Sequence, residues 1–212
     1  MVTSGQTTRR RGRPSKHGLE PGEARERLLR AGLELLTEKS FSATGIDEIL
    51  RRVGIPKGSF YYYFESKEAY GAELIQRYGA YFADKLARHL EDPSRPALAR
   101  IRAFVADARA GMARHGYQRG CLIGNLGQEM GSLPESYRQE LAEVFQDWQR
   151  RLAACLEEAR EAGEIDPYAD CHRLAALFWI GWEGAVLRAK LERDPEALEI
   201  FADGFFAALG PH

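Results

Sequence analysis

A short segment near position 60 places a lysine, a glycine and a serine directly before five successive aromatic side chains. Five aromatics in a row cannot all face one core from a short helix. Phe60 and Phe64 are four positions apart, so both can pack inward, and Tyr61 lies near that stripe. The pattern therefore predicts that Tyr62 and Tyr63 face outward.

The outward side of this segment has the groups that bind a DNA duplex. Lys57 and the backbone N–H groups beside Gly58 can contact phosphates at the start of a helix. Ser59, Tyr62 and Tyr63 can hydrogen-bond phosphate oxygens or reach base edges in the major groove. The other interpretation is an aromatic cluster that only packs a core. The sequence favours a nucleic-acid interface.

The elements that must position this segment are two short helices joined by a tight turn. Residues 44–53 are expected to form the first helix, with Thr44 as its N-cap. Gly54 suits the left-handed conformation that ends a helix, and residues 57–64 form the second helix. This is a helix-turn-helix pattern, and we expect Thr44 and Lys67 to add phosphate contacts.

Apolar residues recur at helical spacing over the rest of the chain, and no alternating run is long enough for a sheet. The expected helices span 23–39, 66–92, 101–115, 141–163, 174–191 and 195–209, with only short or broken helix over 121–131. The predicted fold class is all-α. Residues 174–191 are apolar on almost all sides, which predicts burial between helices or across a dimer interface.

The first 18 residues form a polar, arginine-rich arm that we expect to be flexible. Residues 1–67 hold 13 Lys and Arg against 8 Asp and Glu, a balance of +5, and the remainder holds 17 against 23, a balance of −6. Only the N-terminal part is thus expected to meet a polyanion. Arg11 and Arg13 lie in an Arg-Gly-Arg-Pro run that resembles an AT-hook, which inserts into a narrow A·T-rich minor groove. The alternative is a basic tail that binds phosphates without sequence preference.

The composition and motifs exclude several classes of protein. No apolar run reaches the roughly 20 residues of a membrane span, and the N-terminus lacks the apolar segment of a secretory signal, so we expect a cytoplasmic protein. The three cysteines lack the spacing of a disulfide framework or a zinc site. No phosphate-binding loop, dinucleotide fingerprint, zinc-protease or nucleophile-elbow motif occurs. We expect no catalytic residue, metal or cofactor.

Two N-terminal stretches, residues 44–49 and 54–68, strongly resemble the TetR family of bacterial transcriptional regulators. The position of Tyr62 is often histidine in that family. The resemblance implies a homodimer that binds a palindromic double-stranded DNA operator and represses until a small-molecule effector releases it. It also implies a helix-turn-helix DNA-binding domain over residues 19–68 and a helical ligand-binding and dimerisation domain over residues 69–212.

Three C-terminal segments, residues 111–116, 119–131 and 178–192, carry a narrower resemblance to acrylate-responsive members of the family. They are more distantly similar to members that sense reactive electrophiles through a cysteine and a lysine. In that comparison the cysteine falls on Cys121 and the lysine on Lys190. The implied effector is acrylate or a related unsaturated acid or electrophile.

The residues themselves leave the role of Cys121 open. A neighbouring ammonium, such as that of Lys190, would lower the pKa of the thiol and make it a better nucleophile. Most free cysteines are instead small buried hydrophobes, and this is what we expect for Cys155 on its apolar stripe. Cys171 has no obvious partner. A thiol-based redox or electrophile sensor acting through Cys121 is therefore the alternative to reversible ligand binding.

Glu183 interrupts the apolar segment seven residues before Lys190. A carboxyl group in that position should be paired, protonated or exposed to a wet cavity. One interpretation places Glu183, Lys190, Trp179 and Trp182 around a pocket for a small polar ligand. The other makes the tryptophans core and Lys190 a charge that complements a helix C-terminus. We assign four phenylalanines to a dimer core: Phe178, Phe201, Phe205 and Phe206.

The leading hypothesis is a ligand-controlled, DNA-binding repressor. Two other classes are a small all-α enzyme and an architectural DNA-binding protein without ligand control. The missing catalytic motifs argue against the enzyme. A buried charge inside a large helical domain argues against the architectural protein.

Overall fold

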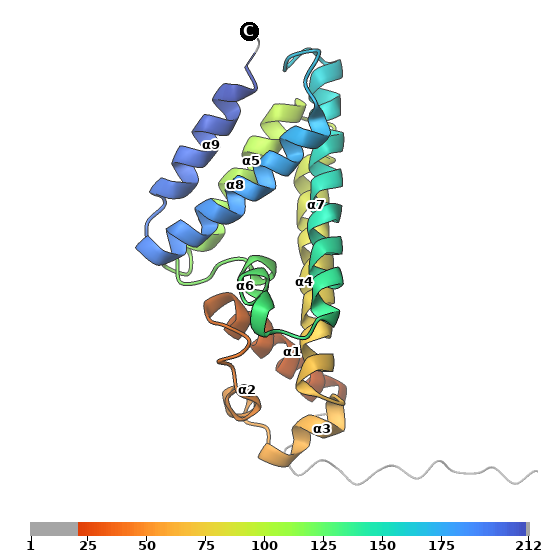
Figure 1. Ribbon diagram of the computed structural model, residues 1–212, viewed down its shortest axis with the longest axis vertical. Helices are drawn as coiled ribbons and strands as arrows, with labels where there is room; N and C mark the ends of the chain where they lie inside the picture. The colour runs from red at the N-terminus through yellow and green to blue at the C-terminus, as the bar shows by residue number, and fades with distance from the viewer. Residues whose placement is uncertain (1–20, 211–212) are drawn as a thin grey trace, which may run out of the picture.

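The computed structural model describes residues 21–210, which form helices joined by turns and loops (Figure 1). The elements are α1 (Pro21–Glu38), α2 (Ile46–Val53), the 3₁₀ turn η1 (Lys57–Ser59), α3 (Phe60–Tyr63), α4 (Lys67–Leu90), α5 (Ala97–Ala113), α6 (Leu122–Gln128), the 3₁₀ turn η2 (Met130–Ser132), α7 (Ser136–Glu161), α8 (Cys171–Glu192) and α9 (Glu196–Ala208). No strand occurs within residues 21–210, and the expected all-α class is confirmed. The arm, with Arg11 and Arg13, lies outside the described residues.

Helices α1, α2 and α3 pack with the start of α4 at one end of the molecule (Figure 1). Phe60 and Phe64 are buried there as expected, with their ring centroids 5.3 Å apart. The ring of Tyr70 in α4 lies 5.3 Å from Phe60, and its hydroxyl donates to the carbonyl of Leu28 in α1 at 2.6 Å. These contacts fix the short helices to α4, which continues into the rest of the molecule.

The turn after α2 has the geometry that its glycine predicts. Gly54 has φ +68°, and its N–H donates to the carbonyl of Arg51 at 3.3 Å, so the residue caps α2 in the left-handed conformation. The prediction that Thr44 caps the start of α2 is wrong. The N-cap is Gly45, and the buried Thr44 hydroxyl donates to the carbonyl of Ser40 at 2.7 Å instead.

The larger part of the chain is built on α4 and α7, two long helices that lie side by side (Figure 1). Trp148 of α7 is fully buried at the centre of the core. Its ring lies 4.4 Å from Phe82 of α4 and 5.0 Å from Trp179 of α8. Helices α5 and α8 pack against this pair, and α9 packs on α8.

The phenylalanines that we assigned to a dimer core pack within the chain itself. Phe178 is fully buried, with its ring 5.7 Å from Trp182 and 5.0 Å from Phe205. Phe206 is also buried, and Phe201 is half-buried against them. The reason is that α9 folds back on α8 and covers this side of it. The opposite side of α8 exposes a different set of large apolar residues: Leu177, Ile180, Leu187 and Leu191.

Helix α6 lies between the two parts of the molecule and next to α1 (Figure 1). It has only seven residues, as the glycine-rich sequence predicts. Helix α4 crosses the boundary that we expected between residues 68 and 69, so the two parts share one continuous helix. No helix among the described residues has the length and apolar character of a membrane span.

Candidate functional site

The structure brings most of the expected DNA-binding residues of the helix-turn-helix onto one surface. Lys57 is 82% exposed in its side chain and Tyr62 is 74% exposed, and both belong to the η1–α3 segment. Gly58 is exposed with open space around it, and Ser59 is half-buried. The Lys57 ammonium pairs with the Asp47 carboxylate at 2.6 Å. That pair is solvent-exposed, so a phosphate can compete for the lysine.

Two tyrosines differ from the expectation. Tyr61 is 67% exposed, although we expected it near the inward stripe. Tyr63 is half-buried against the core, although we expected it to face outward. Its ring lies 4.9 Å from that of Tyr62, so Tyr63 supports its more exposed neighbour.

The side chains of Thr44 and Lys67 are not free to contact DNA at this surface, because both bind within the protein. Thr44 is 1% exposed, so its hydroxyl cannot reach a phosphate in this conformation. The Lys67 ammonium donates to the carbonyl of Phe41 at 2.8 Å and lies 4.4 Å from the Phe41 ring centroid. Burial lowers the pKa of Lys67. Both residues hold the loop between α1 and α2 in shape.

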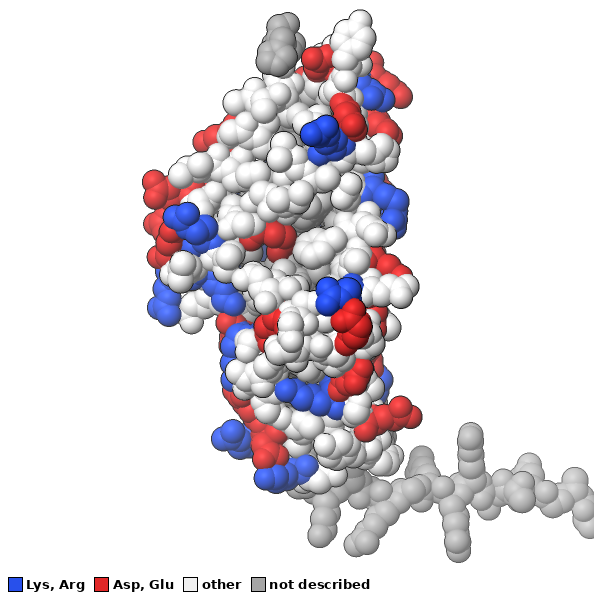
Figure 2. Space-filling view, in the orientation of Figure 1, with Lys and Arg blue, Asp and Glu red and all other residues white. Residues whose placement is uncertain are grey.

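The basic excess of the N-terminal part resides mainly outside its folded residues. Residues 21–67 hold 8 Lys and Arg against 7 Asp and Glu, a balance of +1, so residues 1–20 supply +4 of the total +5. Figure 2 accordingly shows basic and acidic side chains mixed around the α1–α3 end. A phosphate backbone therefore meets individual lysines and arginines there rather than a uniform basic patch.

A cavity of about 350 Å³ lies where the two parts of the molecule meet. Its walls come from α1, α4, α5, the 114–121 segment and α8. The residues that matter below are Glu34 and Thr37 from α1, Tyr78 from α4, Arg119, Cys121, and Trp182 and Glu183 from α8. Because α1 belongs to the helix-turn-helix part, a ligand in this cavity would touch the DNA-binding part directly.

Cys121, Glu183 and Tyr78 meet on the wall of this cavity. Burial and the Glu183 carboxylate raise the pKa of the Cys121 thiol well above its usual value. Burial likewise raises the pKa of Glu183 to about 7, and that of the Tyr78 phenol rises strongly for the same reason. Glu183 Oε2 lies against Gly124, so a Cβ at position 124 would require the Glu183 carboxylate to shift, and the Gly124 N–H donates to Cys121 Sγ at 3.4 Å.

The expectation that Lys190 lowers the pKa of the Cys121 thiol is wrong. The Lys190 ammonium donates to the carbonyl of Thr37, at the end of α1, at 3.1 Å. A Cβ at Gly120 would lie 3.3 Å from Lys190 Cδ, so the lysine stem passes beside the cysteine segment while its charge goes to α1. Lys190 does complement a helix C-terminus, but that of α1 rather than of its own helix.

The two tryptophans have different places. Trp182 is buried and lines the cavity, with its ring stacked on Phe178. Trp179 is 4% exposed in the core between Trp148 and Phe104, and it is not among the cavity residues. The structure therefore brings Cys121, Trp182 and Glu183 together and leaves Trp179 and the Lys190 ammonium outside.

The segment around α6 holds the end of α1 and the loop that follows it. The Gly120 N–H donates to the carbonyl of Thr37 at 2.9 Å, and the Asn125 amide donates to that of Leu36 at 2.8 Å. These groups satisfy carbonyls that a helix C-terminus leaves without partners. At the other end of α6, the Glu129 carboxylate accepts from the N–H groups of Phe41 and Ser42 at 2.8 and 3.0 Å.

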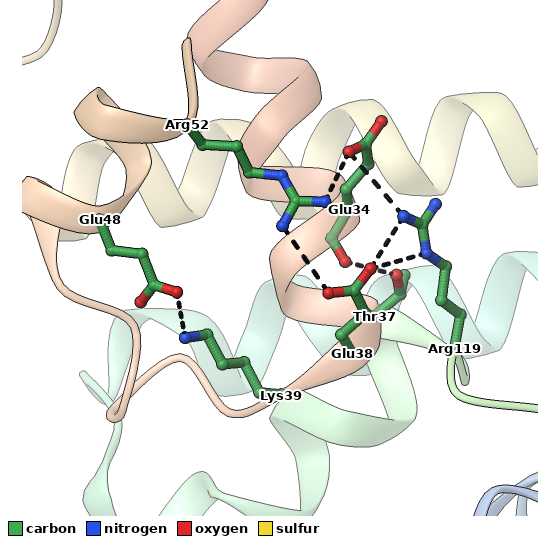
Figure 3. Close-up of polar contacts among 7 residues, drawn as sticks. All are labelled: Glu34, Thr37, Glu38, Lys39, Glu48, Arg52 and Arg119. Carbon is green, nitrogen blue, oxygen red and sulfur yellow. Dashed lines mark hydrogen bonds and ion pairs between the residues drawn. The ribbon is translucent and has the colours of Figure 1, made fainter. Parts of the chain in front are cut away.

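A cluster of four charges links the cavity to α2 (Figure 3). Arg119 donates from Nε to Glu38 Oε1 at 3.0 Å, and its Nη2 lies 2.8 Å from the same oxygen and 3.8 Å from Glu34 Oε2. Arg52 of α2 pairs with the same two acids, at 3.1 Å to Glu34 and 3.8 Å to Glu38. Beside this cluster, a second pair joins Lys39 to Glu48 at 2.5 Å (Figure 3).

Comparison with known proteins decides the family. The protein-family model described as "Bacterial regulatory proteins, tetR family" matches residues 28–70, and the family model "Tetracyclin repressor-like, C-terminal domain" matches residues 97–205. The chain is 51% identical over 196 residues to the transcriptional regulator AcuR of Cereibacter sphaeroides, covering 92% of this chain and 89% of AcuR. The chain belongs to the TetR family.

Further TetR-family proteins agree in sequence and in fold. The repressor NemR of Escherichia coli K12 is 32% identical over 177 residues, covering 84% of this chain and 89% of NemR. A crystal structure of the regulatory protein TetR from Rhodobacter sphaeroides superposes with a TM-score of 0.85 at 51% identity, covering 87% of this chain and 98% of that one. The relatives are transcriptional regulators, which confirms that this chain is a transcriptional regulator and not an enzyme.

Sequence reasoning missed several residues of the site in this TetR-family chain. Tyr78, Arg119, Asn125 and Glu129 were not singled out, although the last three lie within eight residues of Cys121. The residues that they contact are far away in the sequence. The one signal available in the sequence was that Arg119, Asn125 and Glu129 are polar residues in a glycine-rich segment. Among the described residues, no group of histidine, cysteine and acidic side chains could hold a metal ion.

Proposed function

We propose that this protein is a homodimeric repressor that a small unsaturated acid, acrylate or a close relative, releases from a palindromic operator. The observation that carries the proposal is the composition of the cavity wall. Glu34 and Thr37 of α1 line the same cavity as Cys121 and Glu183. A ligand that binds there acts on the DNA-binding part without an intermediate element, provided that it prefers one conformation of α1.

The DNA contact would use the η1–α3 surface. Lys57 and the backbone around Gly58 would hold phosphates, and Tyr62, with Ser59, would reach the base edges. Tyr63 would orient Tyr62 and contact the backbone at its rim. The arm, through Arg11 and Arg13, would add contacts to the neighbouring minor groove or to phosphates.

The dimer would form through α8 and α9. Leu177, Ile180, Leu187 and Leu191 of α8 are exposed together with Ile200 of α9, which is 67% exposed. Figure 2 shows mostly uncharged side chains across the α8 and α9 region of this face. An apolar stripe of this kind fits a two-fold interface, in which the same helices of both copies meet.

The size and chemistry of the cavity suit a small acid. A space of about 350 Å³ combines an apolar side, with Trp182 and Met112, and polar groups at Arg119, Cys121 and Glu183. Reversible binding is the simpler mode, because the raised pKa of Cys121 keeps its thiol protonated at neutral pH. Covalent attack by Cys121 on the β-carbon of an electrophile is the alternative, with the Glu183 carboxylate accepting the thiol proton.

An operator footprint on the DNA that flanks its own gene tests the proposal. We expect protection of two half-sites about one helical turn apart, and loss of protection when acrylate is added. Propionate keeps the carboxylate but lacks the double bond, so release by propionate as well supports reversible binding, and release by acrylate alone supports the covalent mode. Protection that acrylate and related electrophiles leave unchanged would contradict ligand-controlled release. Intact-protein mass after acrylate exposure then separates the reversible from the covalent mode.

A further inference from the structure

We propose that Arg119 is the carboxylate-binding residue of the effector cavity, and that an anionic effector and the acids of α1 compete for its guanidinium. The inference rests on the proposed function, since it names the group that an acidic effector would meet and the change that binding would cause. Binding and release are then two consequences of one exchange of partners at Arg119.

Arg119 lies on the cavity wall, and its Nη1 has no hydrogen-bond partner among the described residues. Its side chain is 25% exposed. Its Nε and Nη2 both approach a single oxygen, Glu38 Oε1, so the contact is not the two-oxygen fork that arginine and carboxylate form at their best. A guanidinium has five N–H donors. The remaining donors, on Nη1 and Nη2, are thus available to a ligand carboxylate.

The other cationic side chains around the cavity are less suitable. The Lys85 ammonium already pairs with Asp107 at 2.9 Å, and the Lys190 ammonium donates to Thr37 at the end of α1. Arg114 is exposed and makes no ion pair with α1 among the described residues. Arg119 combines a position on the cavity wall with a direct contact to the DNA-binding part.

The opposite side of the cluster explains how the exchange would reach the DNA-binding part. Glu34 and Glu38 stand between Arg119 and Arg52 of α2, so the four charges sum to zero (Figure 3). If a ligand carboxylate neutralises Arg119, Arg52 is the one remaining ion-pair partner of the two acids among the described residues, and these three residues carry a net charge of −1. The Lys190 ammonium acts on Glu38 only through a longer-range attraction. The negative end of α1 adds to this unbalanced charge, and Arg52 is drawn further between the acids. Helix α2 carries Arg52, so its packing on α1 would change.

The exposure of these side chains makes such an exchange feasible. Each member of the cluster is between a quarter and two-fifths exposed in its side chain. An ion pair with that exposure contributes a factor of only about 5 or less to the equilibrium constant for forming it. A better-oriented ligand carboxylate can therefore displace Glu38 from Arg119, while a fully buried pair would resist it.

The first test compares acrylate with acrylamide, its uncharged counterpart, by isothermal titration of the full chain. Arg119→Gln should weaken acrylate binding by at least about 10-fold and leave acrylamide binding unchanged. Arg114→Gln is the matched control, since it removes an arginine from the same cavity without a link to α1, and its acrylate affinity should change by less than about 3-fold. Arg119→Lys keeps the charge but loses the fork, and should fall between Arg119→Gln and the wild type. An acrylate affinity that Arg119→Gln leaves unchanged overturns the proposal.

The second test addresses the exchange itself. Coupling is the ratio of the acrylate Kd values with and without saturating operator. Glu38→Gln removes the competitor, so acrylate should bind the free protein up to about 5-fold more tightly while the coupling ratio falls towards one. An unchanged coupling ratio in Glu38→Gln contradicts the exchange.

The same measurements separate this inference from the proposed function. If acrylate releases the wild-type operator complex and Arg119→Gln responds equally, the proposed function stands and the Arg119 proposal is wrong. If neither acrylate nor acrylamide binds the wild type, both are wrong. A melting curve for each variant confirms that the protein is folded in every comparison.

Discussion

The Cys121 thiol faces the Glu183 carboxyl on the wall of the cavity between the two parts of the molecule, and the Lys190 ammonium lies elsewhere, on the carbonyl of Thr37. This arrangement reverses the electrostatics that the sequence suggested. A carboxylate disfavours the thiolate, whereas an ammonium would favour it. Cys121 therefore rests as a thiol, and its reactivity depends on the protonation state of Glu183.

The first prediction concerns that thiol. Glu183→Gln removes the neighbouring negative charge, so the pKa of Cys121 should fall. Alkylation by iodoacetamide at pH 8 should then accelerate about 3-fold for each unit of the decrease, because a lower pKa also makes the thiolate less nucleophilic. Peptide mass spectrometry reads the rate, with Cys155, whose pKa burial raises to about 12, as the internal reference. Lys190→Met should leave the rate unchanged. A slower reaction in Glu183→Gln would instead show that Glu183 accepts the thiol proton.

The second prediction concerns pH and stability. Burial raises the pKa of Glu183 to about 7 in the folded protein, above the value of 4.5 for an unperturbed glutamate. The folded state thus binds more protons between these values, so the free energy of unfolding should fall as the pH rises from about 4.5 to about 7 and then stay level. The contribution is at most about 3 kcal/mol.

Chemical denaturation at pH 5 and pH 8 checks this contribution. Glu183→Gln should lose that part of the pH dependence, while all other carboxylates act equally in both proteins. The same decrease in both proteins would mean that Glu183 does not titrate in this range.

The third prediction concerns DNA. Lys57→Ala should weaken binding to every sequence and reduce the slope of log K against log salt by about 0.9 for the phosphate contact that it loses. Asp47→Asn is the matched control, because it removes the ion pair but leaves the lysine. Its affinity should stay equal or rise. Fluorescence anisotropy over a salt series measures the affinity and the slope. An unchanged slope in Lys57→Ala would show that Lys57 makes no phosphate contact.

The fourth prediction concerns the contact between α6 and the loop after α1. Glu129→Ala removes the acceptor of two backbone N–H groups, at Phe41 and Ser42, and should lower the free energy of unfolding by about 1–3 kcal/mol. It should also weaken the coupling between acrylate and operator, because α6 would no longer hold that loop. Glu135→Ala is the control at an exposed glutamate paired with Arg138. Equal melting temperatures for the two variants would contradict this role of Glu129.

The fifth prediction concerns assembly. Ile180 is 75% exposed at the middle of the apolar stripe on α8. Ile180→Glu should convert the dimer to a monomer, since a charge buried at a two-fold interface meets its own copy. Light scattering after size exclusion gives the mass. Tyr168→Glu, at a residue that is 94% exposed outside the stripe, should remain dimeric. A dimer that survives Ile180→Glu places the interface on another face.

The sequence by itself determined the elements whose causes are local. Apolar spacing predicted the long helices, Gly54 predicted the left-handed end of α2, and the spacing of Phe60 and Phe64 predicted their burial. Each depends on residues a few positions apart, where helical geometry alone fixes which side chains share a face. The exposures of Tyr61 and Tyr63 differ from the expectation because α3 is a single turn that ends at Tyr63. Phe64 is already extended, so helical geometry does not fix the faces of the whole run.

Only the tertiary structure decided which charged and reactive groups meet. Cys121 could have faced Lys190 or Glu183, since both lie on α8, and the packing of α6 against α1 brought the carboxyl to the thiol and the ammonium to Thr37. Arg119 met Glu38, and Glu129 met Phe41, because the 119–129 segment folds onto the end of α1. Helical spacing states which face a residue occupies but not which face of another helix lies opposite. Long-range packing sets that second choice, and with it the pKa of the cysteine and the cavity that we propose as the effector site.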